Sequence, residues 1–149
     1  MPDLWDSGKV TSSETLQIQY DGKPLSSRQK CYWKVRSWDR DGIASDWSET
    51  AFWTMGLLEE SDWKAEYISY EDESSISKDA SKLYLPAARQ YRKAFSSEKE
   101  VARATVYSTA LGIYELEING ARVGDAYFAP GWTDYRQRAN YNTYDVTDL

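Results

Sequence analysis

Short stretches of alternating apolar and polar residues recur along this chain, and one of them runs directly into an Asn-Gly pair. Every second side chain from Tyr114 to Ile118 is apolar, and a period of two is that of a half-buried β-strand. Asn119-Gly120 follows at once, and these two residues tolerate the positive φ that both central positions of a type I′ turn require. The segment therefore predicts a β-hairpin whose return strand begins at 121–123.

Other runs of the same kind predict an all-β protein. Strands are expected at 16–20, 31–38, 50–55, 90–95, 104–109 and 141–146. No segment carries the sustained 3.6-residue apolar stripe of an amphipathic helix. In the clearest strand, 31–38, one face carries Cys31, Trp33 and Val35, which we expect to lie in the core.

Composition narrows the classes of function. A net charge of −6 without a basic cluster argues against nucleic-acid binding, and no apolar run approaches the roughly 20 residues that span a bilayer. The chain has no histidine, and Cys31 is its one cysteine. Nucleophilic sites that depend on histidine, histidine-based zinc sites and an internal disulfide are therefore excluded. Carboxylate chemistry, as in glycosidases, is the catalytic option that remains.

The strands fall into two groups joined by a connector. We expect a first part at 1–56, a connector at 57–62 and a second part at 63–149. The Ser-, Asp-, Glu- and Lys-rich stretch 71–82 is predicted to be a solvated loop. No export signal opens the chain, but the chain looks cut at both ends, so its compartment is left open.

The sequence resembles the bacterial α-L-rhamnosidases of glycoside hydrolase family seventy-eight. The segments that carry the resemblance, in the family's order, are LWDSGKV at 4–10, YWKVR at 32–36, WD at 38–39, WTMGLL at 53–58, DW at 62–63, LGIYEL at 111–116, NG at 119–120, APGWTDYR at 129–136 and YDVTDL at 144–149. The run at 129–136 is specific, whereas the Trp-Asp elements occur in many fibronectin type III-like domains.

The resemblance implies an organisation and an activity for the parent protein. Residues 1–56 resemble the C-terminal half of a fibronectin type III-like sandwich, and 63–149 resemble the first portion of a jelly-roll or galactose-binding-like sandwich. The family's inverting machinery, an acid for the leaving oxygen and a carboxylate that activates water, belongs to a downstream α/α-barrel. The expected partners are that catalytic domain and rhamnose-containing glycans or glycosides, and no catalytic residue is assigned to this chain.

One candidate sugar-binding site follows the turn at Pro130-Gly131. It consists of an aromatic platform beside an ion pair, formed by Trp132, Asp134, Tyr135 and Arg136. Rings stack on the C–H faces of sugars, and ionic groups hydrogen-bond sugar hydroxyls. In the alternative interpretation, Trp132 folds back as a loop anchor while Asp134 pairs with Arg136 or caps the turn.

A second set of residues is expected to be structural, and its members are Trp33, Arg36, Trp38, Trp47, Asn119 and Gly120. Arg36 and Trp38 share a strand face, so a cation–π ladder that includes Trp47 would stiffen the sheet. The competing interpretation of this ladder is a surface for a partner.

The carboxylates offer two further possibilities. Glu115 and Glu117 are separated by roughly 7 Å on one strand face, which suits an inverting glycosidase. They face away from the apolar side of the strand, however, so nothing is expected to hold a proton on either at neutral pH. No cofactor or metal motif is present, although Asp125, Asp134 and Asp145 lie near turns where a calcium ion is an option.

The residues and the resemblance together predict a non-catalytic accessory region of an α-L-rhamnosidase. The alternatives are a stand-alone carbohydrate-binding module and a tandem β-sandwich interaction protein. Half a sandwich exposes strand edges and an apolar face, so we expect a longer chain with both domains whole to melt at a higher temperature.

Overall fold

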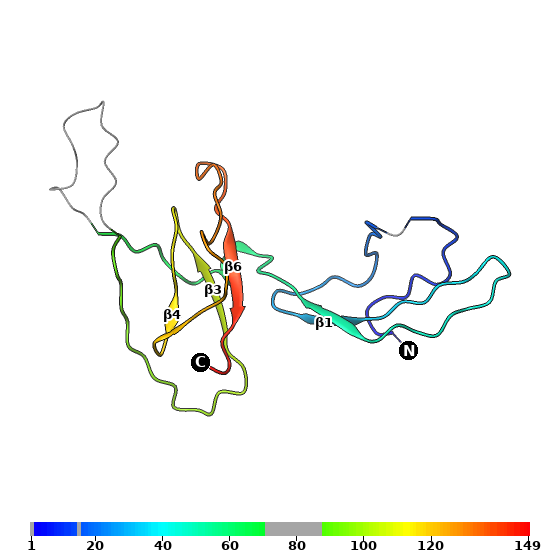
Figure 1. Ribbon diagram of the computed structural model, residues 1–149, viewed down its shortest axis with the longest axis horizontal. Helices are drawn as coiled ribbons and strands as arrows, with labels where there is room; N and C mark the ends of the chain where they lie inside the picture. Colours follow the sequence, from blue (N-terminus) through cyan, green and yellow to red (C-terminus); the bar gives the residue numbers. More distant parts are fainter. Residues whose placement is uncertain (1, 15, 71–87) are drawn as a thin grey trace. The chain divides into compact units, whose positions relative to one another are not determined.

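The computed structural model describes residues 2–14, 16–70 and 88–149, so the predicted loop at 71–82 lies outside the described residues. The chain divides into two compact units, Met1–Lys64 and Ala65–Leu149 (Figure 1). Its regular elements are β1 (Lys30–Trp33), β2 (Ala51–Thr54), the 3-10 helix η1 (Glu60–Asp62), β3 (Thr105–Thr109), β4 (Glu117–Ile118), β5 (Ala121–Arg122) and β6 (Tyr141–Asp145). The described residues contain no α-helix, and the all-β prediction is confirmed.

The first unit is organised around one long hairpin. β1 pairs antiparallel with β2, which places Tyr32 opposite Phe52. Backbone hydrogen bonds extend this pairing toward the turn, where Ser45 N–H donates to the Ser37 carbonyl over 2.9 Å. The carboxylate of Asp39 accepts from two backbone N–H groups of the turn itself, the local bond that makes Asp favourable there. The predicted strands at 31–38 and 50–55 are thus the two arms of a single hairpin.

Only one of the three side chains expected in the core of this hairpin is buried. Cys31 is 1% exposed, whereas Trp33 is 45% and Val35 is 53% exposed. The prediction was right for Cys31 and wrong for the other two. Alternation assigns a side chain to one face of a strand, but burial also requires a second layer over that face. The described residues provide such a layer at Cys31 alone.

Residues 57–62, expected as a connector, are tied to the first unit by a small polar network. The Ser27 hydroxyl donates to the carboxylate of Asp62 and accepts from the N–H of Leu58 over 2.7 Å. Arg28 donates to the Asp62 carbonyl over 2.8 Å, and its guanidinium lies 3.7 Å from the Asp62 carboxylate. This end of the unit is therefore held by side chains from two places in the sequence.

This network predicts an acid-dependent stability of the first unit. The hydrogen bonds from the Ser27 hydroxyl and the Glu59 N–H hold the pKa of Asp62 below its usual value. A folded-state pKa below the unfolded one adds stability above the unfolded pKa, near 4, and that stability is lost as the pH falls through the folded value. Ser27→Ala should raise the pKa of Asp62, which NMR titration of the carboxyl carbon measures. The first unit should then unfold in acid at a higher pH than in the wild type.

The neighbouring serine provides the control for this titration. Ser26 makes no side-chain hydrogen bond with described residues, so Ser26→Ala should leave the pKa of Asp62 unchanged. Ser27→Ala should also lower the stability at neutral pH, because the Leu58 N–H loses its acceptor and the Asp62 carboxylate loses one of its two donors while it keeps the Glu59 N–H. An unaltered Asp62 titration in Ser27→Ala would contradict the role of this hydroxyl.

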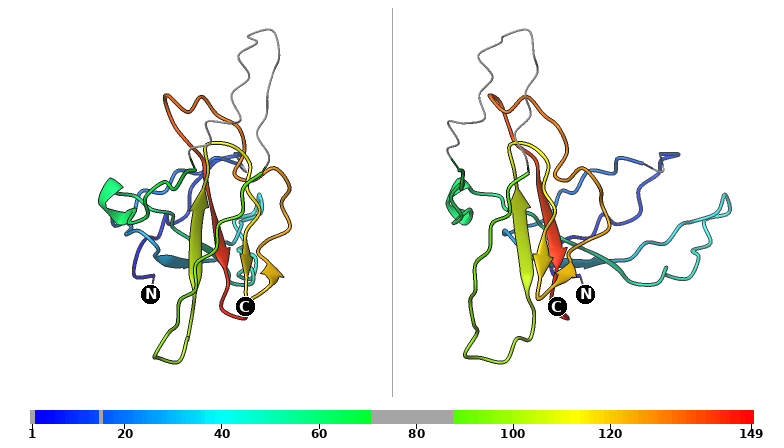
Figure 2. Two further views of the ribbon diagram at one scale, coloured as in Figure 1. Left: turned by 90° about the vertical axis from the view of Figure 1, so that its left-hand side faces the viewer. Right: turned by 60° about the vertical axis from the view of Figure 1, so that its left-hand side comes forward.

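The second unit contains two pairs of antiparallel strands. β3 and β6 pair along their whole length, from Thr105 opposite Asp145 to Thr109 opposite Tyr141, and they lie side by side in both views of Figure 2. β4 and β5 form the hairpin predicted from Asn119-Gly120. The φ angles of these two residues are 53° and 81°, as a type I′ turn requires. The hairpin prediction is confirmed.

The buried part of the second unit is small. Its most buried side chains are Val123, Ala129 and Val146, which are 6–7% exposed. In the same unit the hydroxyls of Tyr114 and Tyr144 lie 3.1 Å apart in a partly buried hydrogen bond. Burial, followed by the hydrogen bond with Tyr144, raises the pKa of Tyr114 to about 12. The phenol of Tyr114 therefore stays neutral at any ordinary pH and keeps its hydrogen bond with Tyr144.

Two of the expected strands are absent. Residues 16–20 and 90–95 are described, but neither is in a strand. Leu16, Ile18 and Phe95 are 78%, 68% and 82% exposed. A strand exists only when a neighbour accepts and donates its backbone hydrogen bonds. Alternation reports the preference of a segment and does not show whether such a neighbour is present.

Candidate functional site

The candidate site lies on the loop that leads into β6. This loop extends past the ends of the strands (Figure 1). It is anchored before and after the site: the Tyr114 N–H donates to the Ala129 carbonyl over 3.0 Å, and the Thr109 hydroxyl donates to the Asn140 carbonyl over 2.6 Å. Gly131, at a φ of 99°, donates its N–H to the Phe128 carbonyl and closes the turn that precedes the site.

Trp132 is the most exposed large apolar side chain among the described residues, at 91%. The part of the alternative in which Trp132 folds back to anchor the loop is therefore wrong, whereas its other part, the pairing of Asp134 with Arg136, is confirmed. The loop is held by backbone and hydroxyl bonds instead, such as the 2.6 Å bond from the Thr133 hydroxyl to the Arg138 carbonyl. These bonds leave the indole without a structural task in the described residues.

Asp134 organises the polar part of the loop. Its carboxylate accepts from the Arg136 Nε at 3.1 Å and from the Gln137 amide at 3.2 Å, while its carbonyl accepts from the Arg138 N–H at 3.0 Å. The side-chain hydrogen bond from Arg136 is the main cause that holds the pKa of Asp134 below its usual value. Asp134 is thus ionised at neutral pH and serves as both ion-pair partner and turn cap.

The structure joins two of the four predicted site residues directly. Asp134 and Arg136 form an ion pair, whereas no ring contact or hydrogen bond recorded for the described residues links Trp132 or Tyr135 to that pair. The Arg136 side chain is 91% exposed. What the loop offers a ligand is therefore an exposed indole face and a guanidinium oriented by Asp134.

Two exposed aromatic residues next to this loop were missed by the sequence analysis. Tyr127 and Phe128 are 74% and 75% exposed, and the Arg122 guanidinium lies 4.5 Å from the Tyr127 ring centroid. The signal was an aromatic pair directly before the Ala-Pro-Gly-Trp run. An aromatic pair is equally typical of the buried side of a strand, so the sequence alone did not show whether these two rings would be buried or exposed.

The residues expected to be structural occupy the two hairpins. Arg36 lies 5.0 Å from the Trp38 ring centroid and 4.6 Å from that of Trp47, so the anticipated ladder of rings and cations exists. Trp33, on the opposite face, is the partly exposed residue described above. Asn119 and Gly120 form the tight turn between β4 and β5.

The carboxylates of the described residues do not converge on a reaction centre. Glu115 and Glu117 are exposed, while Tyr114, Leu116 and Ile118 are partly buried, as alternation predicted. Among the described residues no group of three or more carboxylate or cysteine side chains is placed to hold a metal ion. Asp125, Asp134 and Asp145 therefore do not come together as calcium ligands.

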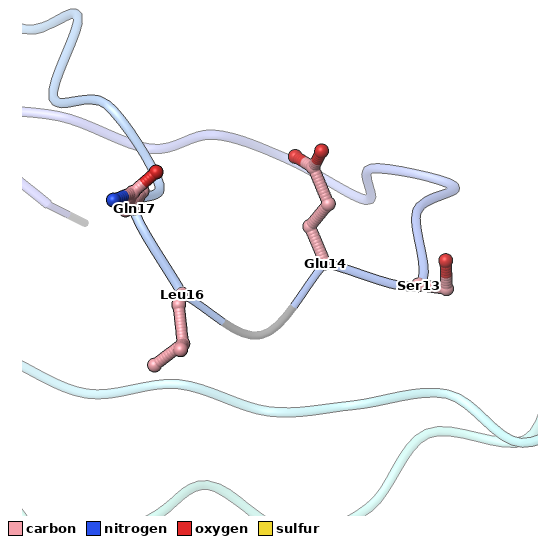
Figure 3. Close-up of a pocket in the computed structure, with 4 residues that line it drawn as sticks. All are labelled: Ser13, Glu14, Leu16 and Gln17. Atoms are coloured by element: carbon pink, nitrogen blue, oxygen red, sulfur yellow. The ribbon is translucent and has the colours of Figure 1, made fainter.

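One shallow depression of about 410 Å³ in the described residues is lined by Ser13, Glu14, Leu16 and Gln17. Figure 3 shows these residues along one loop, with the side chains of Glu14 and Leu16 pointing to opposite sides. A single carboxylate without an acid, base or cation facing it is no catalytic pair. Within the described ranges, no helix combines the length and apolar character of a membrane span.

Comparison with known proteins identifies both units. Residues 1–59 match the family model of the Rha78A-like, N-terminal immunoglobulin domain. Residues 99–149 match that of the α-L-rhamnosidase N-terminal domain. The two matches lie in separate units of the structure.

The similar proteins are themselves α-L-rhamnosidases. An α-L-rhamnosidase of Alteromonas sp. (strain LOR) is 49% identical over 99% of this chain and 16% of its own length, and one of Formosa agariphila is 44% identical over the same shares. The structure of an α-L-rhamnosidase from Dictyoglumus thermophilum superposes with a TM-score of 0.82 at 39% identity, over 99% of this chain and 17% of that one. The chain spans about one sixth of the length of the curated relatives it matches. By sequence and by fold, it belongs to the N-terminal region of the α-L-rhamnosidase family.

Proposed function

We propose that this chain is a non-catalytic accessory region of an α-L-rhamnosidase that hydrolyses terminal α-L-rhamnosides. The observation that carries the proposal is the distribution of the similarity: the relatives match almost all of this chain but only 16% of their own length. The substrates are then rhamnose-containing glycans or glycosides, and the partner is a catalytic domain of the same polypeptide. We further assign 1–56 to a fibronectin type III-like part, 57–62 to a connector and 63–149 to a jelly-roll-like part.

The chemistry of the chain supports this division of labour. Glycoside hydrolysis needs an acid that keeps its proton near neutral pH and a second carboxylate aimed at the same bond. The carboxylates with the clearest partners, Asp62 and Asp134, have a lowered pKa, which is the wrong direction for a general acid. Both carry out structural tasks in their loops. Support of the substrate or of a neighbouring domain is the role that remains.

Hydrolysis assays test the proposal. We expect the full-length protein to release nitrophenol from 4-nitrophenyl α-L-rhamnoside and the purified 149-residue chain to release none. The physical reason is that the described carboxylates do not form the acid and base pair that glycoside hydrolysis needs. Turnover by the purified chain that disappears in Glu115→Gln or Glu117→Gln would overturn it.

The loop at 130–140 is our candidate for direct contact with sugar. Its support is the 91% exposure of Trp132 beside a guanidinium that Asp134 holds in place. An indole face covers the apolar side of a pyranose ring, and the guanidinium donates to its hydroxyls.

Calorimetric titration with L-rhamnose measures this contact. Trp132→Ala should weaken binding about tenfold, because the stacking surface is lost. Phe95→Ala provides the matched control, since Phe95 is an 82% exposed ring of the same unit outside the loop. Equal affinities of wild type and Trp132→Ala would remove the loop from the sugar site and leave the accessory role standing.

Two other functions remain as alternatives, and each predicts a different outcome of the binding and hydrolysis assays. A stand-alone carbohydrate-binding module would bind rhamnose without hydrolysis by any longer form of the protein. A tandem β-sandwich interaction protein would do neither. The length and content of the encoding reading frame separate both from the enzyme, because only the enzyme requires a catalytic domain.

A further inference from the structure

In the first unit, four cationic side chains each lie over an aromatic ring. These are Lys9, Lys30, Lys34 and Arg36. Lys9 is 5.4 Å from the Trp38 centroid, Arg36 lies over both Trp38 and Trp47, and Lys34 is 4.8 Å from the Trp47 centroid. Lys30 extends the series, at 4.0 Å from the centroid of Phe52. We call this row of rings and cations the cation–aromatic face.

The positive charges of this face have no carboxylate partner in the part of the chain that the structure describes. Among the described residues, none of the four cations forms an ion pair or a hydrogen bond to a carboxylate. Arg28, Arg40 and Arg136 all do. In a chain of net charge −6, four unneutralised cations in one row are a local positive field that an anionic ligand would complete.

Side chains of this face are exposed. Cys31, the buried residue of β1, points to the opposite side from Lys30 and Tyr32. On the cation–aromatic face itself, Trp47 is 48% and Phe52 is 59% exposed. Rings and cations are therefore both accessible to a ligand.

We propose that the cation–aromatic face binds an anionic glycan strand, whose sugar carboxylates or sulfates meet the cations while its apolar ring faces stack on the indoles. Successive side chains on one strand face stand roughly 7 Å apart, and the rings of Tyr32 and Trp38 lie before and after the neighbouring cations Lys34 and Arg36. That pattern fits a polymer with spaced charges and flat apolar faces better than an acidic peptide, which lacks such faces. This inference rests on the proposed function, in which the parent protein acts on glycans.

Affinity electrophoresis of the full-length protein tests the proposal with defined probes. Gels contain polygalacturonate as the carboxylate polymer, dextran sulfate as the sulfate polymer, poly-glutamate as the acidic peptide, or neutral dextran. We expect retardation by at least one anionic polysaccharide and none by dextran. Carboxylate and sulfate recognition are told apart by which of the two polymers retards the protein.

Matched variants assign the binding to the face. Lys34→Gln with Arg36→Gln should weaken binding about tenfold, the effect of losing two partly solvated charge contacts. Lys23→Gln with Arg40→Gln removes the same charge from the same unit elsewhere and should change the affinity little. Lys30→Gln is a milder variant should the first pair impair folding, which is checked by thermal melting.

Three outcomes would overturn this proposal: no retardation by either anionic polysaccharide, an equal loss in both double variants, or preferential binding of poly-glutamate. The last would make the face a site for an acidic protein segment. Hydrolysis of 4-nitrophenyl α-L-rhamnoside is measured on the same samples. Retained hydrolysis without glycan binding rejects only the face, whereas absent hydrolysis by the unmodified protein rejects the proposed function.

Discussion

Gly124→Ala should destabilise the second unit by about 3 kcal/mol. Gly124 has a φ of 75°, and a Cβ there would lie 2.5 Å from the Cε1 and 3.0 Å from the Cδ1 of the Tyr144 ring. The positive φ alone costs an alanine about 1 kcal/mol. Displacing a partly buried ring adds roughly 1–3 kcal/mol. The ring has little freedom to move away because its hydroxyl is bonded to that of Tyr114.

Gly120 is a matched control for this substitution. Its φ of 81° is similar, but a Cβ there would meet no atom within 4 Å. Gly120→Ala should therefore cost only the backbone part, about 1 kcal/mol. Urea denaturation followed by intrinsic fluorescence gives both values. Equal losses in the two variants would show that the ring of Tyr144 yields freely.

The contrast between these glycines shows what the sequence can and cannot predict. The turn at Gly120 depends on two adjacent residues and their φ preferences, so the hairpin was predicted correctly. The contact of Gly124 with Tyr144 joins positions 20 residues apart and arises from the loop between them. The pairing of β3 with β6 is of the same kind. Alternation identified both strands but held no information on which strand each would pair with.

The candidate sites also differ in whether neighbouring residues or distant residues determine them. The ladder around Arg36 was foreseeable, because a strand face and a nearby turn fix its members. The exposure of Trp132 was not, because the residues around Pro130-Gly131 predict a turn but do not determine whether the following indole folds back or points outward. The polar network of Ser27 and Asp62 was also missed, since 35 residues separate its members. Local chemistry was thus predictable, and long-range chemistry was not.

The small core of the second unit makes it sensitive to any charge placed inside it. Val146, directly after β6, is 6% exposed, and its N–H donates to the Ala104 carbonyl over 3.0 Å. Its inward orientation continues the alternation of β6, in which Thr143 and Asp145 are exposed while Tyr144 is partly buried. With Val123 and Ala129 as the other buried apolar residues of this unit among those described, Val146 supplies a large share of the apolar contact.

Val146→Asp should therefore destabilise the second unit by about 4 kcal/mol at neutral pH, because it buries an unpaired carboxylate and removes a core side chain. Thr143→Asp, on the exposed side of β6, adds the same charge and should change the stability by less than about 1 kcal/mol. Burial raises the folded-state pKa of the new carboxyl, so the penalty should shrink as the pH falls through that value and the group takes up a proton. Urea denaturation at pH 7 and pH 4 measures both effects. Similar losses in the two variants, or a Val146→Asp penalty that does not change with pH, would show that Val146 lies outside the core.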